Sequence, residues 1–526
     1  MCPRGHRLSI DGSAVVSERL ARRTAVVGAM TVVSRVLGLA RDVIIARAFG
    51  AAAAADAFFV AFRVPNLFRR WFGEGAFSQA FVPVLSEYRE RYQRSEVEAL
   101  VAAVSGTLAA GLVAFTLAGI AAAPALVALF SPGFVGEPEQ FARTVALLRL
   151  TFPYLTLVSL VALAGGVLNT YGVFAVPAFT PVFLNVGLIA GALVVAPHLA
   201  EPIYALAYGV LAGGVLQLAF QLPALARIGM LCVPRLVPGH AGVRQILGLM
   251  APAVFGASVA QLNILIDTAL ASTLVAGSIS WLYYADRMME FPLGVFSIAL
   301  GTVVLPTLSR AFQRADDGGY AATLDWALKL VALVTLPAAV GLAVLSMPIL
   351  TTLFQYGRMT PEDVRAAADA LAAYGIGLVA LSAVKVLAPA YFARQDTRTP
   401  VRVGLVAVVV NVVLNLALIG PLAHVGLALA TSIAAVVNAG LLLRGLLIAG
   451  RYAPQPGWRH LAFAIAAGLM AMTIVLVVVT PPLEVWAAAG APGRGIRLAL
   501  TILAGASAYL ATVTLAGVRL RELARV

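Results

Sequence analysis

Apolar runs long enough to cross a bilayer recur from one end of this sequence to the other. A helix needs about twenty mostly apolar residues to span the hydrocarbon core. The chain is 61% hydrophobic and 12% charged, with a mean hydropathy of +0.94, whereas soluble domains are about 45–50% apolar. The sequence therefore predicts an all-α polytopic membrane protein and argues against a soluble fold.

The runs predict about fourteen transmembrane helices. The second and eighth are too long for one straight crossing, and we expect them to kink, tilt or project from the membrane. The expected spans are 24–49, 54–86, 97–130, 143–170, 177–197, 201–227, 243–273, 277–312, 321–352, 363–393, 399–420, 422–450, 459–480 and 496–518.

A faint internal repeat gives the expected domain organisation. Phe58–Tyr88 aligns with Trp281–Phe312, best where Pro83–Ser86 matches Pro306–Ser309, which pairs the second helix with the eighth. This offset of six helices predicts two parallel six-helix lobes related by a pseudo-two-fold axis along the membrane normal. We expect a cytoplasmic N-terminal tail at 1–23, an N-lobe at 24–227, a C-lobe at 228–450 and a C-terminal helix pair at 451–526.

The net charge of +13 comes almost entirely from arginine. About twenty basic residues fall in one set of loops and tails and about four in the alternate set, so the positive-inside rule predicts that both termini are cytoplasmic. The first set runs from Arg19 through Arg94, Arg235, Arg314, Arg398 and Arg451 to Arg525; the alternate set is Arg358, Arg365, Arg494 and Arg497.

The sequence lacks the residues that several classes of function need. Cys2 and Cys232 form no disulfide framework or metal spacing, and the five histidines are scattered. The basic start of the chain lacks a signal-peptide cleavage pattern, and no nucleotide-binding loop or nucleic-acid motif is present. Because every loop is short, we expect no catalytic domain, no cofactor and no enzyme activity.

The first two expected helices carry charges within the membrane. A charge at the bilayer centre costs about 2.5–3.5 kcal/mol on insertion scales, so such residues usually face water or a partner. Ion pairs that support packing, or arginines that snorkel to an interface, are the structural alternatives, but they leave the surplus of arginine unexplained. The charges are Arg35, Arg41, Asp42, Arg47, Asp56, Arg63, Arg69, Arg70 and Glu74.

Helical spacing orders these charges. Asp56, Arg63 and Arg70 follow one stripe of the second helix at seven-residue intervals, and Pro65 and the glycines beside Glu74 are expected to loosen that helix. A cavity lined in this way would be cationic. The planar guanidinium fork binds two oxygens at once and suits phosphate, so a diphosphate is a natural guest.

Two further polar groups lie in the second half of the chain. Asp286, Arg287 and Glu290 share a helix face and form either a satisfied cluster that locks helices together or a gate that changes pairing. The other group combines carboxylate, amide and hydroxyl oxygens, which suit a small hard cation. The alternative is that these residues form hydrogen bonds between helices. Its members are Asp267, Asn411, Asn415 and Thr431.

Several sequence blocks resemble the MurJ (MviN) family of lipid II flippases, in the multidrug/oligosaccharidyl-lipid/polysaccharide exporter superfamily. The resemblance covers the chain from about residue 20. The blocks are SRVLGLARD at 34–42, DAFFVAFR at 56–63, PNLFRR at 65–70, EGAFSQAFVP at 74–83, SWLYYADRMMEFP at 280–292, LFQYG at 353–357, KVLAP at 385–389, RQD at 394–396 and QPGW at 455–458.

The resemblance implies a central cationic cavity and a groove beside the last two helices that takes a polyprenyl tail. Substrate-binding arginines would be Arg35, Arg41, Arg69 and Arg287. Acidic partners would be Asp42, Asp56, Glu74, Asp286 and Glu290, and the stripe adds Arg63 and Arg70 as gating residues. A sodium ion would bind Asp267, Asn411, Asn415, Thr431 and the carbonyl of Leu427.

We therefore predict a lipid II flippase that works by alternating access. Lipid II would enter from the inner leaflet between the first and eighth helices, and the membrane potential, worth about 2.3 kcal/mol per charge per 100 mV, is an adequate driver. Its partners would be membrane lipids and the peptidoglycan-synthesis or division machinery. The alternatives are a flippase for another lipid-linked glycan, a cation-coupled multidrug antiporter and a non-transporting scaffold.

Overall fold

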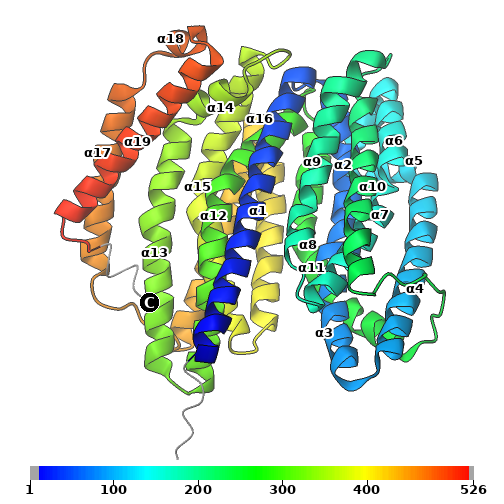
Figure 1. Cartoon of the computed structure of the whole chain (residues 1–526). Coiled ribbons are helices and arrows are strands. Elements are labelled where there is room, and N and C mark those ends of the chain that lie inside the picture. Colours follow the sequence, from blue (N-terminus) through cyan, green and yellow to red (C-terminus); the bar gives the residue numbers. More distant parts are fainter. Residues whose placement is uncertain (1–10, 520–526) are drawn as a thin grey trace, which may run out of the picture. The chain divides into compact units, whose positions relative to one another are not determined.

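The computed structural model describes residues 11–519, apart from the side chains of residues 11–27, 73–74, 253, 255–260 and 295–303. Every regular element in that range is a helix (Figure 1). The helices are α1 (Asp11–Phe49), α2 (Ala53–Arg69), η1 (Arg70–Glu74), α3 (Ala76–Arg91), α4 (Arg94–Ala121), α5 (Ala123–Phe130), η2 (Pro132–Gly136), α6 (Pro138–Thr151), α7 (Tyr154–Thr170), α8 (Ala175–Phe179), α9 (Pro181–Ala190), η3 (Gly191–Val195), η4 (Ala196–His198), α10 (Tyr204–Arg227), α11 (Ala241–Ala271), α12 (Ser278–Gln313), α13 (Asp317–Val344), α14 (Ser346–Phe354), α15 (Pro361–Phe392), α16 (Arg398–Ile448), α17 (Trp458–Val479), α18 (Leu483–Ala488) and α19 (Ala491–Leu515).

The chain divides into two compact units. Unit 1 takes in the described residues up to Ala48, together with Val60–Leu126 and Ala142–Ser258; unit 2 takes in Phe49–Phe59, Val127–Phe141 and the described residues from Val259 onward. Helices α1, α2, α5, α6 and α11 contribute residues to both units. The prediction of lobes at 24–227 and 228–450 is a different division, based on an alignment rather than on packing.

The structure bears out a polytopic membrane protein. Between residues 11 and 519, nine helical stretches are long and apolar enough to cross a membrane. The expected spans 24–49, 54–86, 243–273 and 277–312 are also helical, although they are not among the nine. The helix expected from residue 24 already begins at Asp11. The first ten residues, Arg521 and Arg525 lie outside the described range, as do the side chains of Arg19, Arg22, Arg23 and Glu74.

The second expected span is broken, as its glycines and proline predict. Helix α2 ends at Arg69, a π-helical turn covers Arg70–Glu74, and α3 begins at Ala76. Between them Gly75 has φ −96° and ψ −100°, and a Cβ there would lie 2.2 Å from the carbonyl oxygen of Arg70. The backbone therefore closes on itself in a way that only glycine permits. By contrast, α12 runs unbroken through Pro292 and Pro306.

The long element α16 is two helices that fold back on each other. Ala423 has φ 46° and ψ −129°, which is not helical, and it follows Pro421. The amide of Asn411 donates to the hydroxyl of Thr431 at 3.2 Å, although in a straight helix residues twenty apart would be separated by about 30 Å. The expected spans 399–420 and 422–450 are therefore separate, antiparallel arms.

Each unit has its own apolar core. In unit 1, Phe77 and Phe81 of α3 pack with Leu100 of α4 and with residues of α7 and α11. In unit 2, one core joins α12, α13, α15 and α16. A second joins α13 to α17 and α19, which lie together along one flank of this unit (Figure 1).

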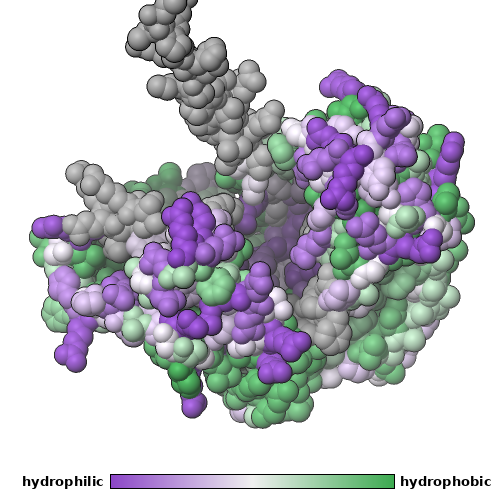
Figure 2. Space-filling view, turned by 90° about the horizontal axis from the view of Figure 1, so that it is seen from below, coloured by the Kyte–Doolittle hydropathy of each residue, from purple (hydrophilic) through white to green (hydrophobic). Residues whose placement is uncertain are grey.

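Basic residues gather at one end of each unit. In unit 1, a guanidinium nitrogen of Arg94 donates to the carbonyl of Ile228, which joins the α3–α4 turn to the α10–α11 linker. In unit 2, Arg451 lies 3.6 Å from Asp317, which joins the α16–α17 linker to the start of α13. Figure 2 shows the helix ends that point downward in Figure 1. Hydrophilic residues lie on these ends, and hydrophobic residues lie on the flanks. This distribution is the one expected of helices that span a bilayer.

Candidate functional site

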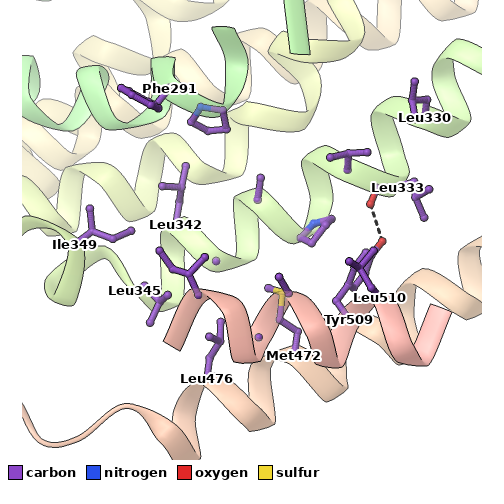
Figure 3. Close-up of a pocket in the computed structure, with 18 of the residues that line it drawn as sticks. Phe291, Leu330, Leu333, Leu342, Leu345, Ile349, Met472, Leu476, Tyr509 and Leu510 are labelled. Carbon is purple, nitrogen blue, oxygen red and sulfur yellow. Dashed lines mark hydrogen bonds between the residues drawn. The ribbon is translucent and has the colours of Figure 1, made fainter. Parts of the chain in front are cut away.

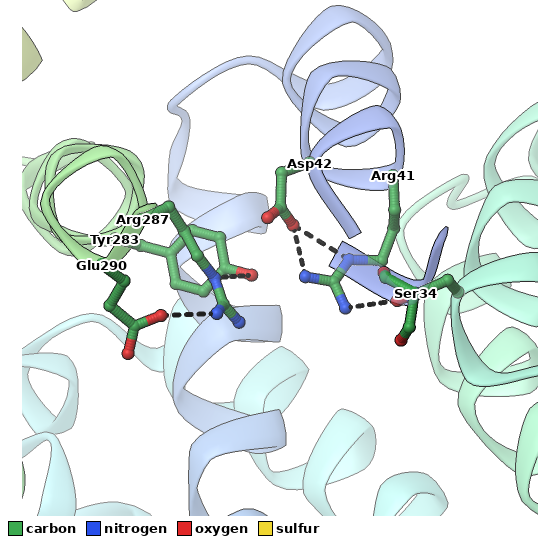
Figure 4. A network of polar contacts seen from close by, with 7 residues as sticks. Ser34, Arg41, Asp42, Tyr283, Arg287 and Glu290 are labelled. Atoms are coloured by element: carbon green, nitrogen blue, oxygen red, sulfur yellow. Dashed lines mark hydrogen bonds and ion pairs between the residues drawn. The ribbon is translucent and has the colours of Figure 1, made fainter. Parts of the chain in front are cut away.

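Arg41 is buried inside unit 1 and fully engaged. Its side chain is 8% exposed, and its Nε and Nη2 both donate to Oδ1 of Asp42, at 2.9 and 2.6 Å. The remaining nitrogen, Nη1, donates to Oδ1 of Asn185 on α9 at 3.0 Å, and Asn185 donates in turn to the carbonyl of Ser34 (Figure 4). An anion that binds Arg41 must therefore compete with Asp42 for the guanidinium group.

Arg287 lies on α12 in unit 2 and is more accessible. Its Nη1 donates to Glu290 at 2.9 Å and its Nε to the hydroxyl of Tyr283 at 3.3 Å (Figure 4). The Tyr283 ring in turn stacks on Phe59 of α2, with 4.1 Å between centroids. The arginine and glutamate side chains are 37% and 50% exposed. The predicted pairing of Arg287 with Glu290 is confirmed, and at this exposure the pair contributes little to stability.

Asp56 of α2 accepts hydrogen bonds from the start of α12. Its Oδ2 accepts from the N–H of Gly277 at 2.7 Å, and its Oδ1 accepts from the N–H and hydroxyl of Ser280 at 2.8 and 2.5 Å. These donors lie at the start of α12, where backbone N–H groups lack helical acceptors. The carboxylate therefore caps α12, an arrangement that favours negative charge at a helix N-terminus.

The other predicted charges differ in exposure. Arg35 and Arg70 are exposed, whereas Arg63, Arg69 and Asp286 are partly buried.

The predicted cation ligands converge in unit 2. Nδ2 of Asn415 donates to Oδ1 of Asp267 at 2.7 Å, and the hydroxyl of Thr431 donates to Oδ2 at 3.1 Å. Asn411 bridges Asn415 and Thr431 at 3.1 and 3.2 Å. This brings α11 and both arms of α16 together. Leu427, whose carbonyl was the fifth predicted ligand, lies one turn before Thr431 and is buried.

The donor set fits a small hard cation. Oδ1 of Asn415 is buried without a hydrogen-bond partner, and a buried unpaired acceptor costs about 1–3 kcal/mol. It lies beside a carboxylate and a hydroxyl, which are the ligand types that suit a hard cation. A bound cation would satisfy this oxygen. Transition-metal sites usually need several histidine, cysteine or acidic ligands, and the described residues contain no cluster of three.

A long apolar groove lies between α12, α13, α14 and the C-terminal helices (Figure 3). Its volume is about 880 Å³, and its lining, all within the described residues, has no charged side chain. Leu333 of α13 and Leu345, which follows α13, form one wall, and Met472 of α17 and Tyr509 of α19 form the other. Tyr509 donates to the carbonyl of Leu333 at 2.7 Å, which connects the walls across the groove (Figure 3).

A buried carboxylate holds one end of the groove together. Oδ1 of Asp325 on α13 accepts from Trp458, Tyr452 and the N–H of Gln455 at 2.7, 2.8 and 3.0 Å. Oδ2 lies 2.7 Å from Nζ of Lys329, and the Asp325 side chain is 3% exposed. Because Tyr452, Gln455 and Trp458 belong to the α16–α17 linker and the start of α17, this network, which we call the Asp325 latch, ties α17 to α13.

A buried arginine holds the other end. Arg494 of α19 donates to the carbonyls of Thr351 and Gln355, both at 3.2 Å, and to those of Ala487 and Ala489. Trp486 of α18, which is buried, donates to the hydroxyl of Thr352 at 2.9 Å. These contacts fasten the α18–α19 segment to the end of α14.

The sequence resembles known proteins along nearly its whole length. A family model described as lipid II flippase MurJ matches residues 45–498. The chain belongs to the MurJ family. It is 46% identical over 517 residues to the probable lipid II flippase MurJ of Vibrio cholerae, covering 97% of this chain and 98% of that protein. It is 45% identical over 461 residues to the lipid II flippase MurJ of Burkholderia cenocepacia, covering 86% and 89%. The predicted family and a location in the bacterial inner membrane are thereby confirmed.

Solved structures agree with the fold. A lipid II flippase MurJ in an inward closed conformation superposes with a TM-score of 0.80 at 27% identity, covering 95% of this chain and 99% of that one. An inward-facing multidrug resistance transporter of the MATE family, in the MOP superfamily, superposes with a TM-score of 0.66 at 12% identity, covering 80% and 95%. The second likeness concerns the fold alone.

Proposed function

We propose that this MurJ-family protein carries lipid II from the inner to the outer leaflet of the cytoplasmic membrane by alternating access. The observation that carries the proposal is the spacing of two residues on α12. Arg287, a partly exposed cation, precedes Phe291 of the groove lining by four residues, so both lie on one helix face about 6 Å apart along the axis. A lipid diphosphate has the same order of parts, an anionic group followed by an apolar tail.

The two parts of this site contribute differently. Lipid tails are as apolar as the groove, so burying the tail there adds little hydrophobic free energy. The groove therefore orients the tail, and the affinity comes from charge-assisted hydrogen bonds to the diphosphate. Arg287 would exchange Glu290 for phosphate oxygens, and Arg41 would exchange Asp42. Arg35 and Arg69 are the further substrate-binding residues that we propose, with the remaining predicted charges as gating partners.

We also propose a sodium ion at Asp267, Asn411, Asn415, Thr431 and the Leu427 carbonyl, and cytoplasmic locations for both termini. The unpaired amide oxygen of Asn415 supports the first proposal, and the basic end of each unit supports the second. A bound cation would hold α11 and the two arms of α16 in one arrangement, which is how ion binding could bias a transport cycle.

The test is replacement of Arg287 by alanine in cells depleted of their own flippase. We expect the Arg287→Ala variant to insert normally and to fail to sustain peptidoglycan synthesis. Arg310→Ala is the matched control: Arg310 lies on the same helix, is exposed, and hydrogen-bonds only within its own turn. Normal growth of the Arg287→Ala cells would show that this arginine is not part of the substrate site.

Purified protein in liposomes separates the proposal from its rivals. We expect transport of lipid II, with much slower transport of an undecaprenyl diphosphate that carries an unrelated glycan and none of a cationic drug. Equal transport of both lipid-linked sugars would identify a general lipid-glycan flippase instead. Drug transport in exchange for cations would identify an antiporter.

A further inference from the structure

A second, smaller apolar cavity lies in unit 1, away from the residues assigned above. Its volume is about 270 Å³, and it lies between the π-turn η1, α3, α4 and the start of α11. Phe72 and Phe115 lie against each other in its lining, with 5.4 Å between ring centroids. On α4 the lining runs from Val104 to Phe115, which is about 16 Å along the axis. The cavity is thus elongated, with the shape of a hydrocarbon chain rather than of a compact ligand.

One end of this cavity carries an unsatisfied polar group. The hydroxyl of Thr107 is buried without a hydrogen-bond partner. Other helical threonines of unit 1, such as Thr151 and Thr170, donate to the carbonyl four residues earlier. Because an unpaired buried hydroxyl is costly, a ligand with an acceptor at this position, such as an ester carbonyl, would gain a hydrogen bond.

An exposed segment that carries an arginine lies next to Thr107. The N–H of Arg235, in the α10–α11 linker, donates to the carbonyl of Ala102 at 2.8 Å. A Cβ on Gly106 would lie 2.2 Å from the carbonyl oxygen of Arg235, so the linker rests directly on α4 one residue before Thr107. The Arg235 side chain is exposed. Its apolar neighbours Val233 and Leu236 are 78% and 67% exposed, a pattern typical of backbone that lies at a membrane surface.

We propose that this cavity, which we call the α4–α11 pocket, binds one anionic phospholipid of the surrounding membrane. The acyl chain occupies the apolar lining, Thr107 donates to the ester carbonyl, and Arg235 pairs with the phosphate and the acidic headgroup. Basic pockets between helices at a membrane surface recognise anionic lipids in this way. Along α4, the apolar lining that ends at Phe115, the Thr107 hydroxyl and the contact with the Arg235 backbone follow one another, which is the order of chain, ester and headgroup in such a lipid.

Gly111 offers a direct way to fill the pocket. It lines the cavity, and a Cβ at this position would meet no atom within 4 Å. The Cβ of a Gly111→Leu variant would therefore meet no atom, and we expect the rest of its side chain to extend into the pocket. Leucine also favours the helix over glycine. Gly248 of α11 is the matched control, since its Cβ also meets nothing within 4 Å but the residue is not part of the lining.

The experiment is native mass spectrometry of the purified full chain with added phosphatidylglycerol or phosphatidylcholine. We expect a tight phosphatidylglycerol adduct that Gly111→Leu lowers at least ten-fold and Gly248→Leu leaves unchanged. Arg235→Gln should weaken it about five-fold, because one basic residue near an anionic surface is worth about 1 kcal/mol. Arg314→Gln, at an exposed arginine of unit 2, should have no effect. Thermal unfolding of each variant checks that it is folded.

Three results would overturn the proposal. Gly111→Leu and Gly248→Leu could bind phosphatidylglycerol equally well, so that the adduct lies elsewhere. Phosphatidylcholine could bind as tightly as phosphatidylglycerol, so that Arg235 does not select charge. Undecaprenyl phosphate could displace phosphatidylglycerol from the wild-type chain but not from Gly111→Leu, which would make the α4–α11 pocket a second polyprenyl site.

Discussion

The Asp325 latch should control how often the α16–α17 linker opens. Replacing Asp325 by asparagine keeps an oxygen for the donors of Trp458, Tyr452 and Gln455 but removes the ion pair with Lys329, which lies 2.7 Å away with a side chain 17% exposed. A hydrogen bond to a charged group contributes about 1.5–3 kcal/mol. With about 1.4 kcal/mol per factor of ten, the open linker should become roughly 10- to 150-fold more populated.

Limited trypsin digestion can measure this opening. Arg451 lies in the linker, and cleavage after it should follow the population of the open form when closing is faster than cleavage. The control is Asp317→Asn, which removes a 3.6 Å contact to Arg451 whose aspartate side chain is 82% exposed. Such surface pairs contribute little, so we expect less than about a five-fold change. If Asp325→Asn is cut no faster than Asp317→Asn, the latch does not hold α17 in place.

Three further predictions concern other contacts. Sodium should raise the melting temperature of the wild-type chain, as any ligand of the folded state does, and Asp267→Ala should abolish the effect; equal stabilisation by potassium would contradict a sodium site. Arg494→Lys should lower the melting temperature by several degrees more than Arg497→Lys, because it leaves buried carbonyls without donors, and equal losses would show that these contacts contribute little. The hydroxyl and N–H of Thr399 hold the pKa of the Asp396 carboxyl below its usual 3.8. The wild-type chain should therefore be more stable than Asp396→Asn above pH 3.8, and this advantage should vanish as the pH falls through the lower pKa of the folded state. Melting curves of both chains from pH 7 to pH 3 test this, and a constant difference in melting temperature would refute it.

The sequence predicted features that depend on the local spacing of residues and on the free-energy cost of polar groups at membrane depth. Apolar runs located the spans, the glycines around Glu74 predicted the break after Arg69, and the i,i+3 spacing predicted the pair of Arg287 with Glu290. The oxygen ligands around Asp267 were found because polar residues at membrane depth need partners. Their convergence is confirmed, while their role in binding a cation stays a proposal.

Other contacts join residues that no local pattern connects. Asn185 is a polar residue in an apolar span and lies 144 residues from Arg41 in the sequence. Its side chain nevertheless accepts a hydrogen bond from the third nitrogen of Arg41. The stripe on the second helix gave no sign that the Asp56 carboxylate caps α12, whose capped residue lies 221 positions away in the sequence. The partners of Arg494 were equally hidden, because backbone carbonyl groups are present at every residue and leave no mark in the sequence. Those of Asp325, apart from Lys329, lie 127 to 133 residues away along the chain.

The π-turn at Arg70–Glu74 changes which way the second membrane segment faces. A π-turn accommodates one extra residue, and one residue rotates a helix face by about 100°. The seven-residue stripe of Asp56, Arg63 and Arg70 therefore cannot continue into α3, whose buried face, with Phe77 and Phe81, belongs to the core of unit 1. A single crossing thus presents charge over its first half and an anchoring surface over its second. Deleting Gly73 from the turn would change the rotation between the two halves by about 100° without removing any side chain that either of them uses.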